Sequence, residues 1–426
     1  MTTRPFDLIA VIGLGYIGLP TAAVIASNGN HVVGIDVNTN AVDTINRGEI
    51  HIVEPKLEEI VRKTVASGLL RAVTQPETAD AYLIAVPTPI TEEKKADLSY
   101  VLSAGKAIAT VLKKGDLVVL ESTSPVGATE TLVKTLSSIR PDLKFPNWAE
   151  DVKDGDIDIH VAYCPERVLP GKVVEELNSN DRAIGGMTSL CTQRAVELYN
   201  LFVDGVLFPT DSRSAELCKL AENAFRDVNI AYANELANVC EGIGMNVWEV
   251  IRLANRHPRV NILQPGPGVG GHCIAVDPWF IAETAPEDTP LIQSARYIND
   301  GRPARVIARV EKAVSGFLLA HTDRNKDSLK IACYGVAFKP NIDDLRESPA
   351  LKITADMARN YPGSIWAVEP NVNSLPEELS HVRLVTQDEA MAEADIHVML
   401  VDHAPFKLKG PSSEYIIDVK GLWKQI

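Results

Sequence analysis

One cysteine of this chain lies in a segment of unusual composition. Residues 266–273 read GPGVGGHC, and five of these eight residues are glycine or proline. Such a loop leaves backbone amides free to line a pocket, and its cost in conformational entropy makes it a poor linker. A thiol acts as a nucleophile when its pKa is depressed or when a base lies near it. The segment therefore predicts covalent catalysis by Cys273. The alternative, an inert buried thiol beside a glycine turn, suits Cys191 or Cys240 better.

A second group of polar residues lies in the segment 214–242, which contains no proline and no glycine before its end. The segment is rich in helix formers, so it predicts a long helix. Lys219, Asn223 and Arg226 are spaced i, i+4 and i+7 and therefore share one face of that helix. An asparagine between two cations on an otherwise apolar helix is suited to bind an anion or to stabilise an oxyanion. A solvated helix face is the alternative interpretation.

A third motif is a G-x-G-x-x-G pattern that directly follows an apolar run near the N-terminus. Asp36 ends the next apolar run, 23 residues after Gly13, which is the spacing expected of an acid that binds the ribose of a dinucleotide. No arginine follows at 37–39 to accept a 2′-phosphate, so NAD is favoured over NADP. A turn that uses its glycines only for packing is the alternative. The predicted cofactor residues are Gly13, Gly15, Tyr16, Ile17, Gly18 and Asp36, with Thr88 and Thr123 as candidates for the nicotinamide end.

The elements that position these residues follow an α/β pattern. Apolar runs at 8–12, 31–35, 81–86, 117–120 and 159–163 predict strands that end at a binding crevice. A second αβ pattern begins at 329–338, after the polar stretch 321–328, and lacks the glycine motif. The sequence thus predicts two Rossmann-like, doubly wound domains joined by a long central helix or helical domain. We place an N-terminal domain at 1–212, a central helical domain at 213–318 and a C-terminal domain at 319–426.

Composition limits the partners and the compartment. The net charge of −14 and a pI near 5.2 argue against nucleic acid, which demands clustered positive charge. Any anionic ligand then needs a local cationic pocket. The six cysteines form no CxxC pair and no metal-like spacing, so we expect reduced thiols and no metal site. No signal peptide and no long apolar run are evident, so we expect a cytoplasmic protein without a membrane partner.

The combination of motifs resembles a known family. The dinucleotide motif, the Lys-x-x-x-Asn helix, the cysteine loop and the segment FKPNIDDLRESPA at 338–350 are similar to those of the UDP-glucose/GDP-mannose dehydrogenase family, over essentially the whole chain. Members oxidise the C6 alcohol of a nucleotide sugar to a carboxylate with two NAD. The resemblance implies that Cys273 attacks an intermediate aldehyde. The resulting thiohemiacetal gives up a second hydride, and water hydrolyses the thioester that remains.

The resemblance also implies roles for single residues. Lys219 and Asn223 would stabilise the developing oxyanion, Asp277 would assist water or proton handling, and Glu166 would lie near the reacting centre. The implied substrate contacts are Arg167, Val168, Lys219, Asn223, Arg226, His257, Arg259, Gly270 and Lys339, and Arg346 is placed on the cofactor side. A surface charge pair is the alternative for Lys339 and Arg346. In relatives, the arginine that corresponds to Arg259 can reach across a subunit interface. The resemblance therefore implies a homodimer.

Two segments resemble one branch of the family and thereby imply the substrate. CPERVLPG at 164–171 and the residues around the cysteine loop resemble the branch of the family that acts on UDP-N-acetyl-D-mannosamine, in the synthesis of surface polysaccharide precursors. The UDP-glucose branch carries a glutamate where this chain has Pro170, so a role for that carboxylate does not carry over. Arg167 and Val168 are our candidates for accommodating the N-acetyl group.

Other functions remain open at this point. The same chemistry on UDP-GlcNAc or UDP-glucose is one alternative. A two-electron dehydrogenase of the hydroxyacid or 6-phosphogluconate type is another, although the Cys273 loop argues against it. A non-catalytic nucleotide-binding module is the third. The presence of Lys219, Asn223 and Cys273 together argues against it.

Overall fold

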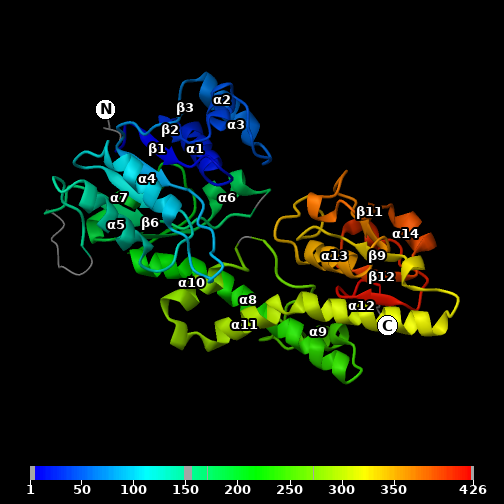
Figure 1. Ribbon diagram of the computed structural model, residues 1–426. Coiled ribbons are helices and arrows are strands. Elements are labelled where there is room, and N and C mark those ends of the chain that lie inside the picture. Colours follow the sequence, from blue (N-terminus) through cyan, green and yellow to red (C-terminus); the bar gives the residue numbers. More distant parts are fainter. Residues whose placement is uncertain (1–4, 148–155, 170, 272, 424–426) are drawn as a thin grey trace. The chain divides into compact units, whose positions relative to one another are not determined.

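Figure 1 shows the computed structural model of the chain, which describes residues 5–147, 156–169, 171–271 and 273–423. Pro170, which we contrasted with a glutamate of the UDP-glucose branch, lies outside these ranges. The chain divides into two compact units, one of Met1–Glu222 with Trp279–Pro286 and one of Asn223–Pro278 with Glu287–Ile426. Helix α8 (Ser212–Gly242) begins in the first unit and continues in the second. The three-part division at 212 and 318 stays a prediction.

The first unit is built around an eight-stranded sheet of order β3-β2-β1-β4-β5-β6-β7-β8. All neighbouring strands in it are parallel except β6 and β7, which run antiparallel. Its strands are β1 (Ile9–Ile12), β2 (Val32–Ile35), β3 (Leu70–Val73), β4 (Ala81–Ile84), β5 (Leu117–Leu120), β6 (His160–Tyr163), β7 (Arg182–Gly186) and β8 (Leu207–Asp211). Its helices are α1 (Gly18–Ser27), α2 (Thr39–Asn46), α3 (Leu57–Ala66), α4 (Ser99–Ala109), α5 (Ala128–Ile139), α6 (Val173–Ser179) and α7 (Ser189–Tyr199).

Helices cover both faces of this sheet, which explains why its central strands are continuous apolar runs. Ile9 and Val11 of β1 belong to one core cluster together with residues of α1, α2, α3 and α6. Ala10 and Ile12 belong to a second cluster, together with residues of α4 and α5. Successive side chains of a strand point to opposite faces, so the two clusters lie on opposite sides of the sheet. This is the doubly wound arrangement that the sequence predicts.

The second unit contains a five-stranded parallel sheet of order β11-β10-β9-β12-β13. Its strands are β9 (Ile331–Tyr334), β10 (Ile365–Val368), β11 (Arg383–Leu384), β12 (Ile396–Met399) and β13 (Ile416–Asp418). Ile331 and Cys333 pack with residues of α12 and α13, whereas Ala332 and Tyr334 pack on the other face with Ala390 of α14. The helices of the central and C-terminal parts are α9 (Val247–Ala254), α10 (Asp277–Thr284), α11 (Pro290–Asp300), α12 (Arg302–Ala320), α13 (Pro349–Asn360) and α14 (Gln387–Glu393).

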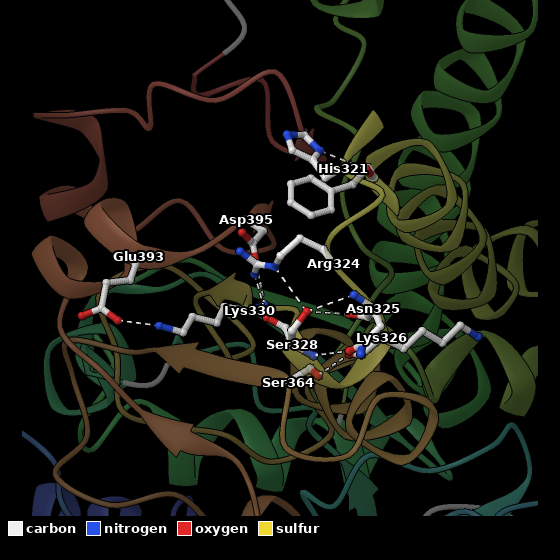
Figure 2. Close-up of polar contacts among 10 residues, drawn as sticks. His321, Arg324, Asn325, Lys326, Ser328, Lys330, Ser364, Glu393 and Asp395 are labelled. Atoms are coloured by element: carbon white, nitrogen blue, oxygen red, sulfur yellow. Dashed lines mark hydrogen bonds and ion pairs between the residues drawn. The ribbon is translucent and has the colours of Figure 1, made fainter. Parts of the chain in front are cut away.

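The polar stretch before β9 is tied to the second sheet and is not a free linker. Figure 2 shows the Arg324 guanidinium donating to the carboxylate of Asp395, at 2.5 Å, beside the start of β12. Asn325 and Ser328 form a reciprocal capping box around one turn of 3₁₀ helix. Lys330 then pairs with Glu393 at 2.6 Å. These contacts fix the point at which β9 enters the sheet. No helix in the described part of the chain is long and apolar enough to cross a membrane.

Candidate functional site

The glycine motif forms an open cradle at the end of β1. Gly13 has a φ of +89°, and a Cβ there would lie 2.7 Å from the carbonyl oxygen of Ala85. A Cβ on Gly18 would lie 1.7 Å from the carbonyl oxygen of Gly13, so this glycine is required for the turn to close onto α1. A Cβ on Gly15 would have no protein atom within 4 Å. Gly15 therefore leaves open space beside the start of the helix, where the pyrophosphate of a dinucleotide binds.

Asp36 lies at the end of β2, beside this cradle. One carboxylate oxygen accepts the backbone N–H of Leu14 at 2.8 Å, and the other accepts that of Asn38 at 2.9 Å. The side chain is half-buried, so its remaining acceptor capacity can reach a ribose hydroxyl. Between the second and third glycines, Tyr16 is exposed and Ile17 is half-buried. The residues present fit an NAD molecule.

The strand ends next to the cradle bring Thr88 and Thr123 together. The hydroxyl of Thr88 donates to the carbonyl oxygen of Thr123 at 2.5 Å. The following helix, α5, is held at its start by Glu216 of α8. That carboxylate accepts the N–H groups of Gly127 and Thr129, at 2.7 and 2.8 Å. Sequence reasoning missed Glu216, because an acid on a helix gives no sign that it caps another helix 89 residues away.

Glu166 is buried and already paired. Its carboxylate accepts from the guanidinium of Arg182 at 2.9 Å and from the backbone N–H of Arg167 at 2.5 Å. Beyond Arg182 lies Glu121, whose carboxylate accepts from the Tyr199 hydroxyl at 2.5 Å. Burial raises the pKa of Glu121 to about 7, against the lowering effect of the Tyr199 hydrogen bond and of Arg182. The acid predicted near the reacting centre thus belongs to a buried charge cluster, of which Glu121, Arg182 and Tyr199 were missed.

The two residues after Glu166 have different surroundings. The guanidinium of Arg167 lies 3.3 Å from the carboxylate of Glu222, and both side chains are partly exposed. Val168 packs against the hydrophobic core of the first unit. Arg167 is therefore available to a ligand on the surface of this unit, and Val168 contributes at least part of its side chain to packing.

Cys273 lies four residues before helix α10 and is exposed. Its carbonyl oxygen accepts the backbone N–H groups of Val276 and Asp277, at 3.0 and 2.9 Å, so the loop leads directly into the first helical turn. By contrast, Cys191 and Cys240 are buried, as expected of inert thiols.

Asn223 and Asp277 are brought together as partners. The side-chain amide of Asn223 donates to the carboxylate of Asp277 at 2.6 Å, and Asp277 is buried. Lys219 lies one turn earlier on α8 and is half-buried, and Arg226, further along, is exposed. Because Asn223 orients the carboxylate, Asp277 presents a fixed acceptor close in the chain to Cys273.

The start of the cysteine loop is clamped from two sides. The N–H of Gly266 donates to the side-chain oxygen of Asn234 at 2.9 Å, and its carbonyl oxygen accepts from the Arg302 guanidinium at 2.9 Å. Asn234 also donates to Asn299 at 2.9 Å, and Asn299 donates to the carboxylate of Asp227 at 2.8 Å. These side chains are buried, and burial lowers the pKa of Arg302 to about 10. Sequence reasoning missed this clamp.

The far end of the loop packs against the C-terminal part of the same unit. A Cβ on Gly270 would lie 2.5 Å from the carbonyl oxygen of Glu347, so only glycine fits. The Phe338 ring is the nearest neighbour of Gly271. A cavity of about 170 Å³ adjoins this contact, and its lining includes Gln264, Gly268, Phe338, Pro340, Asp402 and Lys420. Gln264, Asp402 and Lys420 were not predicted.

The predicted cations of this unit are all exposed. The Lys339 ammonium lies 5.1 Å above its neighbour's ring, that of Phe338. Arg346 makes a two-point pair with Asp344, at 2.9 and 2.6 Å. His257 and Arg259 lie after α9, where the Arg259 N–H faces the His257 ring nitrogen at 3.3 Å. Lys339 is therefore close to the cavity, whereas Arg346 forms the charge pair that was its alternative interpretation.

A doubly wound sheet with an open glycine cradle and an acid after the second strand defines a dinucleotide-binding dehydrogenase fold. The chain belongs to the UDP-glucose/GDP-mannose dehydrogenase family. The family's NAD binding domain matches residues 7–203, its central domain 213–301 and its UDP binding domain 332–425. The family resemblance, the α/β fold class and NAD as cofactor are thus confirmed, and the chain is an NAD-dependent dehydrogenase.

Among curated proteins, the chain is 57% identical over 423 residues to UDP-N-acetyl-D-mannosamine dehydrogenase of Escherichia coli K12, covering 98% of this chain and 100% of that one. It is 56% identical over 421 residues to NDP-N-acetyl-D-galactosaminuronic acid dehydrogenase of Ralstonia nicotianae, covering 98% and 96%. Among solved structures, UDP-D-ManNAc dehydrogenase of Pyrococcus horikoshii matches with a TM-score of 0.85 and 37% identity, covering 98% and 96%. UDP-N-acetyl-mannosamine dehydrogenase of Staphylococcus aureus matches with a TM-score of 0.81, 38% identity and the same coverage.

Proposed function

We propose that this enzyme oxidises the C6 alcohol of UDP-N-acetyl-D-mannosamine to the carboxylate of UDP-N-acetyl-D-mannosaminuronate, with two NAD per sugar. The observation that carries the proposal is the exposed position of Cys273, four residues before α10, at the end of a glycine loop that packs against the UDP binding domain. The name of the Escherichia coli relative, identical at 57% of positions, supports the choice of sugar.

The chemistry needs one covalent stage. When bound, NAD accepts a hydride from C6 in each of two steps. The first converts the alcohol to an aldehyde and releases the hydroxyl proton. The Cys273 thiolate then adds to the aldehyde carbon, and the new alkoxide takes up a proton to give a thiohemiacetal. Loss of a second hydride and of that proton leaves a thioester. Water hydrolyses the thioester to the acid and restores the thiol.

The other predicted catalytic residues have defined tasks in this proposal. Lys219 supplies positive charge for the oxygen that becomes an alkoxide. Asn223 holds the Asp277 carboxylate by its 2.6 Å hydrogen bond, and Asp277 takes a proton from the water that attacks the thioester. Glu166 is already engaged by Arg182, so we assign it to holding the 164–169 segment in place and not to free proton exchange.

The nucleotide part of the substrate is assigned to the cavity beside the cysteine loop. Phe338 and Pro340 line it within the UDP binding domain, and Lys420, which pairs with Asp402 at 3.3 Å, adds a cation. Lys339, next to Phe338, is placed to meet a phosphate. We assign Arg167, with His257, Arg259 and Arg226, to further substrate contacts, and Arg346 to the cofactor side. These local cations are what a chain with a net charge of −14 needs to bind a pyrophosphate.

We further propose that the enzyme is a homodimer. Phe225, Tyr232 and Val239 repeat every seven residues on α8 and expose 70%, 55% and 53% of their surface. Residues with this spacing share one helix face, and an apolar stripe of this kind on a charged protein marks an interface. On α11, Tyr297 is exposed as well and lines a groove together with Val239. A second copy of the chain is the occupant that we propose.

The product would serve as a precursor of surface polysaccharide.

The sugar is tested by measuring NADH release with UDP-N-acetylmannosamine, UDP-N-acetylgalactosamine, UDP-N-acetylglucosamine and UDP-glucose in parallel. We expect the first to give the highest kcat/KM and two NADH per sugar. The galactose-configured sugar is included because of the name of the Ralstonia relative. A higher kcat/KM for any other sugar would overturn the proposed substrate, and one NADH per sugar would overturn the four-electron reaction.

A further inference from the structure

Glu369 and His403 form a buried pair that the proposed chemistry does not use. Glu369 directly follows β10, and His403 follows β12. The Nε2 atom of His403 lies 2.9 Å from a carboxylate oxygen of Glu369, and both side chains are fully buried. A buried acid next to a buried imidazole is costly unless the polar atoms of both have hydrogen-bond partners.

The partners fix the tautomer of His403. Its Nδ1 atom lies 2.8 Å from the backbone nitrogen of Asn341, which is a donor only. Nδ1 must therefore accept, and the ring proton is on Nε2, from which it is donated to Glu369. The side-chain amide of Asn371 also reaches Nδ1, at 3.0 Å, and donates to the other oxygen of Glu369 at 3.1 Å. Each ring nitrogen of His403 thus has its own partner and its own role.

The pair holds both ends of one short segment. Glu369 accepts the backbone N–H groups of Val336 and Ala337, at 2.9 and 3.2 Å, and His403 accepts that of Asn341. Burial alone would raise the pKa of Glu369, but the hydrogen bonds from His403 and Val336 bring it below its ordinary value. Asn341 has a φ of +63°, and its side-chain oxygen accepts the N–H of Ala404 at 2.8 Å. The segment 336–341 is therefore fastened at its start and at its end.

Phe338 and Lys339 lie between these two attachment points. The Phe338 ring packs over Gly271, two residues before Cys273. Ala337, Phe338 and Pro340 line the cavity of about 170 Å³ to which we assign the nucleotide. A shift of this segment would move the wall of the cavity and the surface that supports the cysteine loop.

We propose that His403 is a positioning residue, which sets the segment 336–341 against the nucleotide cavity through the bond from the Asn341 N–H to Nδ1. The proposal rests on the proposed function in one respect, the assignment of the nucleotide to this cavity. His403 touches neither the substrate nor the reacting atoms in this scheme. It acts through Asn341 and, by way of Glu369, through Val336 and Ala337.

Two substitutions separate the two ring nitrogens. His403→Asn keeps an acceptor near the position of Nδ1, whereas His403→Gln keeps a donor near Nε2 and loses that acceptor. The probe is UDP alone, titrated calorimetrically into the full-length enzyme. We expect His403→Gln to weaken UDP binding about tenfold, the cost of one lost buried hydrogen bond, and His403→Asn to weaken it less than about threefold. NAD affinity, measured in the same way, stays at the wild-type value in both variants.

His403→Gln is matched by His397→Gln. His397 is also buried in the second unit and bonds to the Tyr334 hydroxyl at 2.9 Å, and burial lowers its pKa to about 4. We expect His397→Gln to reduce stability while UDP affinity stays at the wild-type value. Two results would show that positioning by Nδ1 is wrong. One is that His397→Gln weakens UDP binding as much as His403→Gln does. The other is that His403→Asn and His403→Gln lower the affinity for UDP equally.

Hydrogen exchange provides a readout that needs no ligand. The peptide that covers 336–344 should take up deuterium faster in His403→Gln than in the wild type, and in His403→Asn nearly as slowly as in the wild type. Unchanged exchange in His403→Gln would overturn the proposal. A wild-type enzyme that does not bind UDP at all would instead contradict the proposed function, and exchange alone would then decide the role of His403.

Discussion

The carboxylate of Glu369 accepts the backbone N–H of Val336 at 2.9 Å, where Val336 follows a glycine at the end of β9. Asp36 accepts the N–H of Leu14 at 2.8 Å in the same place in the first sheet, after Gly13 and β1. Both αβ halves thus join their first two strands through an acid at the end of the second. In the first half the acid is half-buried and open to a ribose, whereas in the second His403 covers it. Only the first half can use its acid for a dinucleotide.

Asp36→Asn should remove the charge of this acid and keep one of its two backbone hydrogen bonds. The amide oxygen of asparagine can still accept the N–H of Leu14, whereas its amide nitrogen cannot accept that of Asn38, and the charge that repels a 2′-phosphate is lost. We expect KM for NAD to rise about tenfold and the preference for NAD over NADP to shrink by at least as much, the effect of one charge-assisted hydrogen bond. Initial rates at saturating sugar measure both. An unchanged NAD preference would contradict the assigned role of Asp36.

Removal of the Cys273 thiol should stop acid formation. Cys273→Ala cannot form the thiohemiacetal, so we expect the rate of acid production to fall by at least about a thousandfold. Cys273→Ser should stall the second stage. Production of the uronate is followed chromatographically, together with the NADH formed per sugar. Cys240→Ala, which removes a buried thiol on α8, is the control and should keep the wild-type stoichiometry. A Cys273→Ala enzyme that makes acid at the wild-type rate would refute covalent catalysis.

The clamp on Gly266 should couple stability to catalysis. Asn234→Ala leaves the buried N–H of Gly266 and the side-chain oxygen of Asn299 without their partner, which costs about 1–3 kcal/mol in the free energy of unfolding. Because Gly266 begins the cysteine loop, we also expect a lower kcat with an unchanged affinity for NAD. Urea unfolding and initial rates measure the two effects. Asn229→Ala, at a half-buried position of the same helix, should change neither, and equal losses in both variants would contradict the clamp.

The dimer should depend on the exposed stripe of α8. Introducing charge with Phe225→Glu and Tyr232→Glu together should yield a monomer of the chain's 46.3 kDa, while the wild type sediments at twice that mass. Leu319→Glu places the same charge at a singly exposed leucine of α12 and should leave the dimer intact. Sedimentation velocity distinguishes these states. A double variant that still sediments as a dimer would place the interface elsewhere.

The parts of the fold and site that sequence could predict are those set by local spacing. The glycine cradle and Asp36 belong to one β-α-β unit, so 23 residues suffice to relate them. The fully apolar strands β1, β4 and β5 were predicted for the same reason, whereas β3, β7 and β8 carry polar residues or proline and were not.

The clamp on Gly266 and the Glu121–Tyr199 pair could not be predicted. Their hydrogen bonds join residues that are separated in the sequence by 32, 36 and 78 positions. A single polar residue in an apolar element produces no periodic pattern in the sequence. Its partner is determined by how the elements pack, so the sequence does not indicate it.

The buried Glu121 should make stability depend on pH. Its pKa rises from an ordinary value of 4.5 to about 7 on folding, chiefly because of burial. Between these values the folded chain keeps a proton that the unfolded chain has released, so stability falls as pH rises through this range and is level above it. The full contribution of this one group is at most about 3 kcal/mol. The charged groups and hydroxyl that act on Glu121 are Tyr199, Arg182 and Glu166.

Glu121→Gln removes this titration and keeps an oxygen that accepts from Tyr199. We expect the stability of the variant, relative to the wild type, to increase between pH 4.5 and 7 and then to stay constant. Urea unfolding at half-unit steps of pH measures the difference, in which the contributions of the other acids cancel. Glu130→Gln, at an acid that pairs with Arg213 near the surface, is the control and should give a difference without this rise. A constant difference across the range for Glu121→Gln would mean that Glu121 is ionised in the folded enzyme at pH 5.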